Sequence, residues 1–500
     1  MTGQCFVMGH NAMHHNDLQH REFDAVVVGG GIVGAVQALL LGQHGISVLL
    51  IDAARVEGQS APLQQRSVAL SHRSFELLQS AGLWPADSVC TISEIQVTNR
   101  GSFGSVRITA DDLNSDALGY VVANHSFEQH LRCLLKSQQN IEVLQPATAT
   151  LEHHSDSGAR LRVSAIDCDS AQSPPLPLVA AAETASETVA ESAAETVAPD
   201  NADDGAKHVA VEHVAAQGEL TDENDKASLP PADFIAHCRV LIAADGTHSQ
   251  IRQGLGLGLR QQDYDQVAVV ANVECQLDHR QVAYERFTDS GPLALLPLAD
   301  RCMAMVYTAR AADAESLNAM GDGEFLQLLQ QRFGGNLGRF RQIGLRALFP
   351  LVLSESESQA VGCCVLIGNS ARTLHPVAGQ GLNLALRDVF ALTARVAPAL
   401  QTAAGTEQDL APEDPIDWSM LLADFQRQRR SDQKKTVRRT DLLARLFSDD
   451  RIPGSGMLRG AGLLLLNGFA PVRKRFAEDS AGIGVPLGHG RGNHRENKVE

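Results

Sequence analysis

The stretch FDAVVVGGGIVGAVQALLLGQHGISVLLID, Phe23 to Asp52, decides the fold. It opens with a short apolar run at Ala25–Val28, which favours a buried strand. An apolar segment of helical length follows at Ile32–Leu41, and a second apolar run at Val48–Ile51 favours another buried strand. This order predicts a βαβ unit of about 30 residues, and with it an α/β fold built on a parallel sheet.

Glycines occupy the junction between the first strand and the helix of this unit. Gly29, Gly31 and Gly34 have the G-x-G-x-x-G spacing, and Asp52 stands at the end of the second strand. Glycines there let the backbone approach a pyrophosphate at the helix N-terminus, and the acid accepts hydrogen bonds from a ribose. The alternative is that the glycines serve only close helix packing. Within the βαβ context we favour dinucleotide binding, and this unit alone fits FAD and NAD equally.

A second loop-to-helix junction appears late in the chain, in VLIGNSARTLHPVAGQGLNLALRDV, Val365 to Val389. A strand enters a loop of small residues, and a new helix is expected to start near Gly381. Its N-terminus would direct free N–H groups at an electron-rich group. A flavin needs such a partner at its pyrimidine edge, where negative charge collects on reduction, whereas nicotinamide does not. The junction therefore favours FAD.

The remaining chain alternates between helical and strand patterns. We expect a helix at Ser126–Leu135, a strand at Ile141–Leu144, a strand at Val240–Ala244 ending in Asp245-Gly246, β-rich structure over Val267–Tyr307 with a turn at Ser290-Gly291-Pro292, a strand at Val361–Ile367, and basic helices after Pro415. With 500 residues the chain exceeds one ordinary core, so two lobes or one lobe with a large insertion are expected.

Composition narrows the class of protein. The nine cysteines are scattered, with only Cys363 and Cys364 adjacent, which indicates reduced thiols in a cytoplasmic protein and no zinc site. The start of the chain lacks the pattern of a secretory signal and is expected to be a disordered tail. No stretch approaches the roughly 20 apolar residues of a spanning helix.

Most of the negative charge lies in one segment. Residues 169–231 carry thirteen acidic residues against Lys207 and Lys226, so eleven of the seventeen excess negative charges lie there. This segment, rich in Ala, Glu, Ser, Thr and Pro, has almost nothing to bury, and we expect a disordered acidic insert. The acidity gives no support for nucleic-acid binding.

As a set, these motifs resemble the single-FAD aromatic hydroxylases of the para-hydroxybenzoate hydroxylase type. The resemblance is closest to one branch, the flavoprotein hydroxylases of ubiquinone biosynthesis, and within it to the 2-polyprenyl-6-methoxyphenol hydroxylases. It rests on GGGIVGA, RSVALS at Arg66–Ser71, LIAADGTHS, YERFTDSGPLALLPL, the late junction, and the basic tail pattern RQRRSDQKKTVRRTDLLARLF. It covers the chain from Asp24 to about Phe476, except the acidic insert.

The resemblance implies a set of cofactor-binding residues. Gly29, Gly31 and Gly34 are expected at the FAD pyrophosphate, Asp52 at the adenosine ribose, Arg66 near the cofactor, Asp245 near the phosphates, Gly368 and Asn369 along the ribityl chain, and Pro376, Gly379, Gln380, Gly381, Leu382 and Asn383 along the isoalloxazine. Most of the wider family has Asp where Asn369 stands, and the methoxyphenol branch shares the change. The family arginine that meets the pyrophosphate aligns with His130, and Arg132 lies two residues on, so either residue is a candidate.

The resemblance also implies a domain organisation. The expected fold is α/β, with a Rossmann-like FAD-binding domain, an inserted, mainly antiparallel β-sheet substrate domain, and a helical C-terminal region. The expected boundaries are a tail at 1–21, a discontinuous FAD-binding domain at 22–90, 121–167, 232–262 and 360–400, a substrate domain at 91–120 and 263–350, an acidic insert at 168–231, and the helical region at 415–480.

The activity implied is that of an FAD-dependent monooxygenase, which adds one oxygen atom from O2 to a polyprenylated methoxyphenol in ubiquinone biosynthesis. The flavin carries the chemistry, so no catalytic side chain or metal is expected; NAD(P)H is expected as a transient reductant. Two alternatives stay open: hydroxylation of another ring position or another aromatic, and a non-catalytic flavoprotein scaffold for other ubiquinone-biosynthesis proteins. A polyprenyl substrate dissolves in membranes, so peripheral contact with the inner face of the membrane is expected, and Gly460–Phe469 is a candidate interfacial helix.

Overall fold

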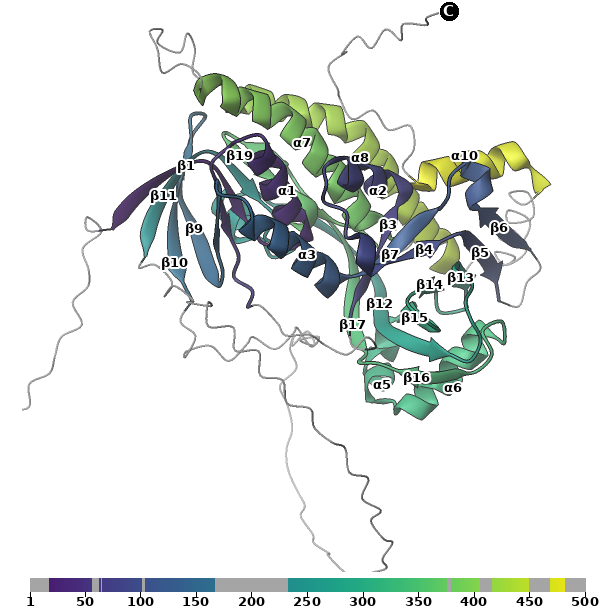
Figure 1. Ribbon diagram of the computed structural model, residues 1–500. Coiled ribbons are helices and arrows are strands. Elements are labelled where there is room, and N and C mark those ends of the chain that lie inside the picture. The colour runs from purple at the N-terminus through teal and green to yellow at the C-terminus, as the bar shows by residue number, and fades with distance from the viewer. Residues whose placement is uncertain are drawn as a thin grey trace, which may run out of the picture.

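The computed structural model describes residues 18–55, 63, 65–100, 104–166, 233–375, 379–404, 416–448 and 468–481. The acidic insert, most of the predicted tail, Pro376 and most of the candidate interfacial helix lie outside these residues. The described chain forms two lobes, one built on a parallel sheet with helices and one on an antiparallel sheet (Figure 1).

The eight-stranded sheet forms the first lobe. Its strands are β1 (Gln19–Val28), β2 (Val48–Ile51), β8 (Ile141–Leu144), β9 (Ala147–His154), β10 (Ala159–Ala165), β11 (Phe234–Ala243), β18 (Ala360–Val361) and β19 (Cys364–Leu366). The order β19-β11-β1-β2-β8 is parallel throughout. The predicted βαβ unit is its centre, and β2 and β8 have their predicted bounds.

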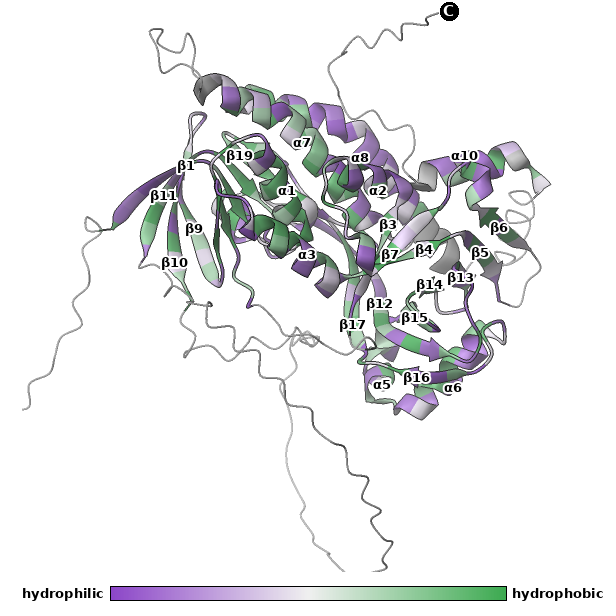
Figure 2. Ribbon diagram, viewed as in Figure 1, coloured by the Kyte–Doolittle hydropathy of each residue, from purple (hydrophilic) through white to green (hydrophobic). Residues whose placement is uncertain are grey.

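Helices cover this sheet and complete its core. They are α1 (Ile32–Gln43), α3 (Asn124–Lys136), α7 (Gln380–Ala404) and α8 (Trp418–Ser448), with α4 (Gln250–Gly254) following β11. Buried side chains of α1, α3, α7 and the start of α8 join those of the parallel strands in one cluster. In Figure 2, α1 is hydrophobic and α8 largely hydrophilic, because α1 lies inside the lobe and α8 on its outside.

The second lobe is a nine-stranded sheet. Its strands are β5 (Glu94–Asn99), β6 (Ser105–Thr109), β12 (Leu259–Cys275), β13 (Val282–Phe287), β14 (Pro292–Pro297), β15 (Cys302–Arg310), β16 (Phe340–Ile343), β17 (Ala347–Ser356) and β20 (Arg372–Thr373). All of its pairs are antiparallel except β5 with β13. Two helices, α5 (Ala314–Ala319) and α6 (Asp322–Phe333), pack on one face.

A small sheet lies between the two lobes. It consists of β3 (Ser67–Ser71), β7 (Gly119–Ala123) and β4 (Val89–Ile92), in the order β3-β7-β4. The helix α2 (His72–Ser80) follows β3, and short 3-10 helices lie at Ala86–Ser88, Ala110–Leu113, Ala311–Asp313 and Gly368–Ser370. The helix α10 (Ala470–Ala481) packs against this region through Ala477.

The structure corrects two predicted elements. The tail was expected to reach residue 21, but β1 begins at Gln19, because its polar start pairs in register with β11. The predicted strand Val361–Ile367 is two strands, β18 and β19, joined by a turn in which Gly362 has φ of +55°. Such a φ favours glycine and reverses the chain. Among the described residues, no helix is long and apolar enough to cross a bilayer.

Candidate functional site

The glycines of the turn after β1 differ in whether neighbouring backbone leaves space for a side chain. Gly29 has φ of +105°, and a Cβ there would lie 2.4 Å from the carbonyl oxygen of Ala244; a Cβ on Gly34 would lie 1.8 Å from the carbonyl oxygen of Gly29. A Cβ on Gly31 would meet no protein atom within 4 Å. The backbone packing itself therefore requires Gly29 and Gly34, whereas Gly31 leaves open space in front of the helix.

That space faces the N-terminus of α1. Gly31 is the N-cap residue, no side chain bonds to the cap, and the first turn carries no acidic residue. The first N–H groups of a helix have no partner within the helix, and they carry the positive end of its dipole. A pyrophosphate fits this position by charge and by hydrogen bonding.

Asp52 lies just beyond β2, beside this turn. One of its carboxylate oxygens accepts a hydrogen bond of 2.8 Å from the side-chain amide of Gln145. Among the described residues, the other oxygen receives a 3.4 Å contact from the backbone N–H of Ala54 and no further hydrogen bond. The carboxylate is held in place and retains acceptor capacity for a ribose hydroxyl.

Asp245 occupies the equivalent place at the end of β11. One oxygen accepts from the backbone N–H of Ile251 at 3.2 Å. Its other oxygen, Oδ1, is buried and has no hydrogen-bond partner in the part of the chain that the structure describes. Buried polar atoms are nearly always satisfied, so this oxygen fits a bound group with a donor. The neighbouring Gly246 has φ of +83° and open space where a Cβ would stand.

The turn after β19 brings Gly368 to the same edge of the sheet. Gly368 has φ of +63°, and its Cβ position lies 3.3 Å from Val33 of α1. The hydroxyl of Ser370 donates to the carbonyl oxygens of Ala243 and Ile367, at 2.7 Å each, which fixes this turn against the end of β11. Asn369 is exposed on it. Residues from three distant parts of the chain therefore meet at the carboxyl ends of β1, β11 and β19, the usual ligand edge of an open α/β sheet.

The side chain of Asn383 joins the start of α7 to the small sheet through hydrogen bonds. Its amide oxygen accepts from the N–H of Ser71 at 2.8 Å and from the hydroxyl of Ser74 at 2.7 Å. Its amide nitrogen donates to the carbonyl oxygens of Ala69, at 3.0 Å, and Gly379, at 2.7 Å. This side chain is fully engaged in holding the helix start, so contact with a flavin is left to its backbone. No sequence pattern predicts Ser71 and Ser74 as the partners of Asn383, because they lie more than 300 residues away.

The other residues predicted around the helix start differ in burial. Gly379 has φ of +57° and lies 3.3 Å, at its Cβ position, from the Cβ of Ala69. Gln380 is buried, Gly381 faces open space, and Leu382 packs against the core of the first lobe. Pro376 is outside the described residues.

The edge of the expected cofactor site carries Arg66 and, on α3, the candidates His130 and Arg132. The guanidinium of Arg66 is exposed and stands 5.5 Å from the ring centroid of Phe349 on β17. His130 has a buried Nε2 without a partner among the described residues. Desolvation lowers the pKa of His130, against the opposing charge of Asp87, so its imidazole is neutral at neutral pH. Arg132 is partly buried, and the choice between the two residues stays open.

His375 precedes the undescribed part of the late loop. Its ring packs edge-on against Tyr264, with centroids 5.1 Å apart. Desolvation lowers its pKa to about 4, although the charge of Asp441 acts in the opposite direction. The imidazole is therefore neutral at physiological pH, which fits a residue that shapes the loop better than one that carries a positive charge.

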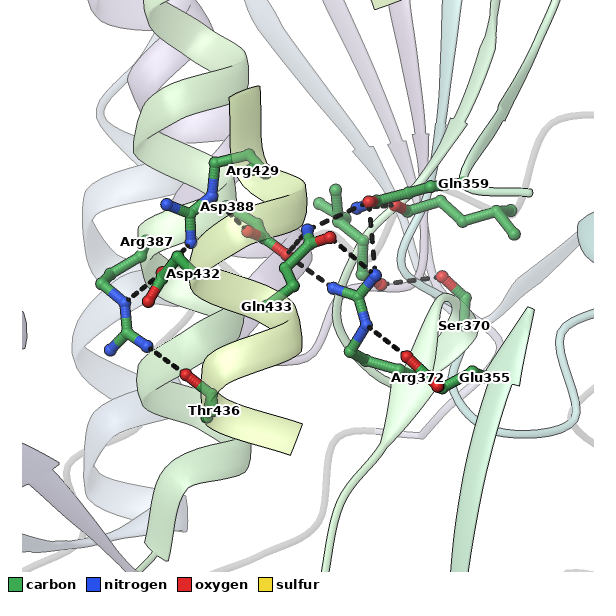
Figure 3. A network of polar contacts seen from close by, with 12 residues as sticks. Glu355, Gln359, Ser370, Arg372, Arg387, Asp388, Arg429, Asp432, Gln433 and Thr436 are labelled. Atoms are coloured by element: carbon green, nitrogen blue, oxygen red, sulfur yellow. Dashed lines mark hydrogen bonds and ion pairs between the residues drawn. The ribbon is translucent and has the colours of Figure 1, made fainter. Parts of the chain in front are cut away.

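A buried ionic network supports the helix start from behind. Asp388 of α7 accepts from Arg429 of α8 at 2.6 Å and from Arg372 of β20 at 3.2 Å, and Arg387 donates to Asp432 at 3.0 Å (Figure 3). The side chains of Arg387, Asp388 and Arg429 are each 2% exposed. Burial alone would raise the pKa of Asp432, but the charges of Arg387 and Arg429 outweigh it and lower that pKa. The network ties α7, α8 and the strand after Gly368 together.

The fold and this edge define a dinucleotide-binding protein with a second helix N-terminus of the kind a flavin ring requires. Residues 22–410 match the family described as the FAD binding domain. The chain belongs to this family. It is an FAD-dependent monooxygenase.

Three relatives illustrate the similarity. Ubiquinone hydroxylase UbiL of Rhodospirillum rubrum is 28% identical over 92% of this chain and 89% of its own. The 3-demethoxyubiquinol 3-hydroxylase of Escherichia coli is 25% identical over 74% of this chain and 78% of its own. The human mitochondrial ubiquinone biosynthesis monooxygenase COQ6 is 26% identical over 91% of both chains.

Solved structures share the fold at low identity. The p-nitrophenol 4-monooxygenase PnpA of Pseudomonas putida has a TM-score of 0.66 at 15% identity, over 93% of this chain and all of its own. CabE, an aromatic hydroxylase from angucycline biosynthesis, has a TM-score of 0.60 at 17% identity, over 93% of this chain and 77% of its own. These neighbours confirm the predicted fold class.

Proposed function

We propose that the protein hydroxylates the ring of a polyprenylated methoxyphenol in ubiquinone biosynthesis, with O2 as the source of the oxygen atom. The observation that carries this proposal is the similarity to UbiL and to human COQ6 over more than nine-tenths of this chain. Both names refer to ubiquinone, and the motif resemblance narrows the substrate to a 2-polyprenyl-6-methoxyphenol.

Different residues of the site would bind different parts of FAD. Gly31 and the N-terminus of α1 receive the pyrophosphate, Asp52 the adenosine ribose, and Gly368 with Asn369 the ribityl chain. The N-terminus of α7, from Gly379 to Asn383, would bind the flavin ring on its pyrimidine side and would stabilise negative charge there. Bound FAD supplies the redox chemistry with O2. The protein's own contribution is to orient the cofactor, exclude water and position the phenol.

NAD(P)H is the proposed reductant. The G-x-G-x-x-G spacing occurs once in the sequence and serves FAD, so a nicotinamide cofactor would bind transiently. Stopped-flow reduction of the purified flavoprotein by NADPH and by NADH, each with and without the phenol, tests this step. Failure of both to bleach the flavin band in the presence of phenol would point to an external electron carrier.

Hydroxylation of a different ring position is a second candidate. It is favoured by one relative, the Escherichia coli enzyme, whose name specifies the 3-position of a demethoxyubiquinol. The intermediate that accumulates in a deletion strain separates the candidates. Accumulated 2-polyprenyl-6-methoxyphenol, cleared by the plasmid-borne wild type, supports the first proposal; an accumulated demethoxyubiquinol supports the second; a normal quinone profile rejects both.

Peripheral membrane contact belongs to this proposal, because the substrate carries a polyprenyl tail. Phe469 at the described end of the candidate segment is 58% exposed, and Val472, just beyond it in α10, is 45% exposed; Lys474 and Arg475 follow and are exposed too. Apolar side chains beside cations suit an anionic bilayer surface. Liposome co-sedimentation of the wild type and of the Phe469→Ser, Val472→Ser double variant tests this surface, and equal binding by both would exclude it.

A further inference from the structure

The two faces of the nine-stranded sheet have different neighbours. Side chains alternate between the faces along each strand, and paired residues share a face. Val269 and Leu295 lie in the cluster formed with α5 and α6, so their face is covered by those helices. On the opposite face, Asn272 donates to the backbone carbonyl of Gln65 at 2.7 Å, and Phe349 lies under Arg66. That second face therefore looks toward β3 and the cofactor side of the molecule.

Strand register identifies the residues on this second face, which we call the floor. One row across the sheet follows from the pairing of β5, β13, β14, β15, β12 and β17: Val97, Glu285, Ala294, Val306, Val270 and Ala347. The neighbouring row toward Asn272 adds Ala283, Leu296 and Ala304. Several of these side chains are alanines, which project only a methyl group from the sheet. Glu285 is the only acid in either row.

The small sheet stands opposite the floor. Val121 of β7 belongs to the cluster that includes Ala283, so that face of the small sheet is directed at the floor. Ala69 of β3 pairs with Val121 and therefore lies on the same face. Gly379, at the start of α7, is a neighbour of Ala69, because a Cβ added at Gly379 would lie 3.3 Å from the Cβ of Ala69. The helix start expected to meet the flavin ring thus adjoins the layer between the small sheet and the floor.

The carboxyl group of Glu285 is in an unusual electrostatic position. The side chain is partly accessible, yet desolvation by the surrounding protein raises the pKa of Glu285 from 4.5 to about 7, and no charged group contributes to the shift. On β4 the thiol of Cys90 faces this layer; burial raises its pKa and the charge of Asp300 adds to the rise, so the thiol is neutral at these pH values. Arg473 of α10 is paired with Asp112 at 3.0 Å.

We propose that Glu285 is the group that accepts the hydroxyl proton of the phenol substrate. This inference rests on the proposed function and adds a residue to it. Three observations carry it: Glu285 is the one acid in the two floor rows, the floor faces the small sheet, and the α7 start adjoins the same layer. An aromatic ring lying on the alanine-rich floor would place its hydroxyl against this carboxylate.

The proton step balances without a further reagent. The phenol O–H bond breaks, its proton forms an O–H bond with Glu285, and the electron pair stays on the phenol oxygen. The resulting phenolate is more electron-rich and attacks an electrophilic oxygen more readily, while O2 and reduced FAD supply the oxygen atom and the electrons. The ring C–H bond at the hydroxylated carbon breaks as the ring regains aromaticity, and the second oxygen atom of O2 leaves as water, which takes up that proton. Glu285 then returns its own proton to the phenolic oxygen of the product.

The strength of the base fits the task. A phenol has an ordinary pKa of about 10, like tyrosine, and a glutamate one of about 4.3, so an unshifted carboxylate would hold the proton about a million times too weakly. With the pKa of Glu285 at about 7, the deficit falls to about a thousandfold. A base whose pKa lies near the working pH is also the most effective one.

The kinetic test compares Glu285→Gln with the wild type, as FAD-loaded full-length proteins acting on the methoxyphenol. We expect kcat to fall by about 10²-fold or more. In the wild type, the rate should fall about tenfold for each pH unit below 7, and this limb should be absent from the variant. On ring-fluorinated, more acidic phenols the ratio of wild-type to variant rates should shrink, whereas a merely structural defect would affect all phenols alike.

The matched control is Glu94→Gln on the adjacent strand β5. Glu94 lies on the opposite face of the sheet, where it accepts from Arg107 and, at 2.8 Å, from Gln96. Its replacement should leave the acidic limb of the pH profile in place. A Glu285→Gln enzyme within threefold of wild type, or one that keeps that limb, overturns the inference.

A binding experiment separates this inference from the proposed function. The probes are 2-methoxyphenol and 1,2-dimethoxybenzene, which differ in the hydroxyl proton, and binding is followed by the perturbation of the oxidised flavin spectrum. The wild type should prefer the phenol by at least about tenfold, and Glu285→Leu should lose that preference. A wild type that shows this pattern but does not turn over the polyprenyl phenol refutes the substrate and retains Glu285; equal preference in Glu285→Leu removes Glu285.

Discussion

The buried network behind the α7 start predicts a large effect of Asp388→Asn. Asp388 accepts from Arg429 at 2.6 Å, from Arg372 at 3.2 Å and from Gln433 at 3.0 Å, and its side chain is 2% exposed. Removing its charge leaves Arg372 and Arg429 short of a counter-ion, with side chains that are 12% and 2% exposed. Breaking a buried pair on one side costs about 3–5 kcal/mol. For a lobe of this size, that corresponds to a fall in Tm of roughly 6–20 °C.

A thermal scan that follows the release of flavin fluorescence measures this effect. The matched control is Asp424→Asn, because Asp424 of α8 pairs with Arg395 of α7 between the same two helices, with side chains 43% and 32% exposed. An exposed ion pair contributes only about 0–1 kcal/mol, so the control should lose a few degrees at most. The variant should also release FAD faster than the control at 25 °C, because the network holds the helix start.

A double-mutant cycle makes the reasoning refutable. Asp388→Leu and Arg429→Met should each be strongly destabilising alone, and the double variant Asp388→Leu, Arg429→Met should lose less than the sum of the two, because neither charge is then left without the partner it had in the wild type. Equal shifts for Asp388→Asn and Asp424→Asn, or strictly additive losses in the cycle, would show that the network does not act as a buried ionic cluster.

Three further changes have expected outcomes. Gly31→Ala should fold normally and show an unchanged circular dichroism melt without FAD, but it should bind FAD at least about tenfold more weakly in a titration. Gly34→Ala should fail to fold, because its Cβ would lie 1.8 Å from a carbonyl oxygen. Asn383→Ala leaves four polar groups without their partner and should lower stability by about 2–4 kcal/mol in a thermal scan. The control Asn369→Ala changes a residue on an exposed turn and should melt like the wild type when both apoproteins are scanned. Because the pKa of Glu285 is raised in the folded protein from 4.5 to about 7, this group favours folding most below pH 4.5 and that stability is lost as pH rises through 7. Glu285→Gln should therefore be more stable than wild type at pH 8, by at most about 3 kcal/mol, with the gain shrinking at pH 5; a gain independent of pH would contradict the shifted carboxyl.

Local patterns predicted the first lobe well because its strands are short apolar runs bounded by glycine or polar residues. Val48–Ile51 and Ile141–Leu144 are strands with their predicted bounds. The polar start of β1 was missed, since nothing in QHREF favours a strand until it pairs with β11. Gly362 was read as part of a buried strand because its positive φ leaves no trace in hydrophobicity.

The candidate site was predicted where it depends on glycine and on strand ends, and missed where it depends on tertiary partners. The sequence predicted basic helices after Pro415 but not the burial of Arg429, which lies between α7 and α8 because Asp388 and Asp432 meet it there. The hydrogen bonds of Asn383 with Ser71 and Ser74 join residues more than 300 positions apart. Glu285 resembles any strand glutamate until the register assigns it to the floor.

The long connection between β10 and β11 has a consequence for engineering the chain. These strands are antiparallel neighbours, with Val163 opposite Phe234, so the polypeptide leaves and re-enters the sheet at adjacent points. The entropy of closing a loop rises only slowly with its length, and the fold therefore sets little limit on what is spliced in there. A two-residue turn such as Asn-Gly, or a reporter domain whose own termini are close together, should be tolerated at this seam without disturbing the flavin edge on the far ends of the strands.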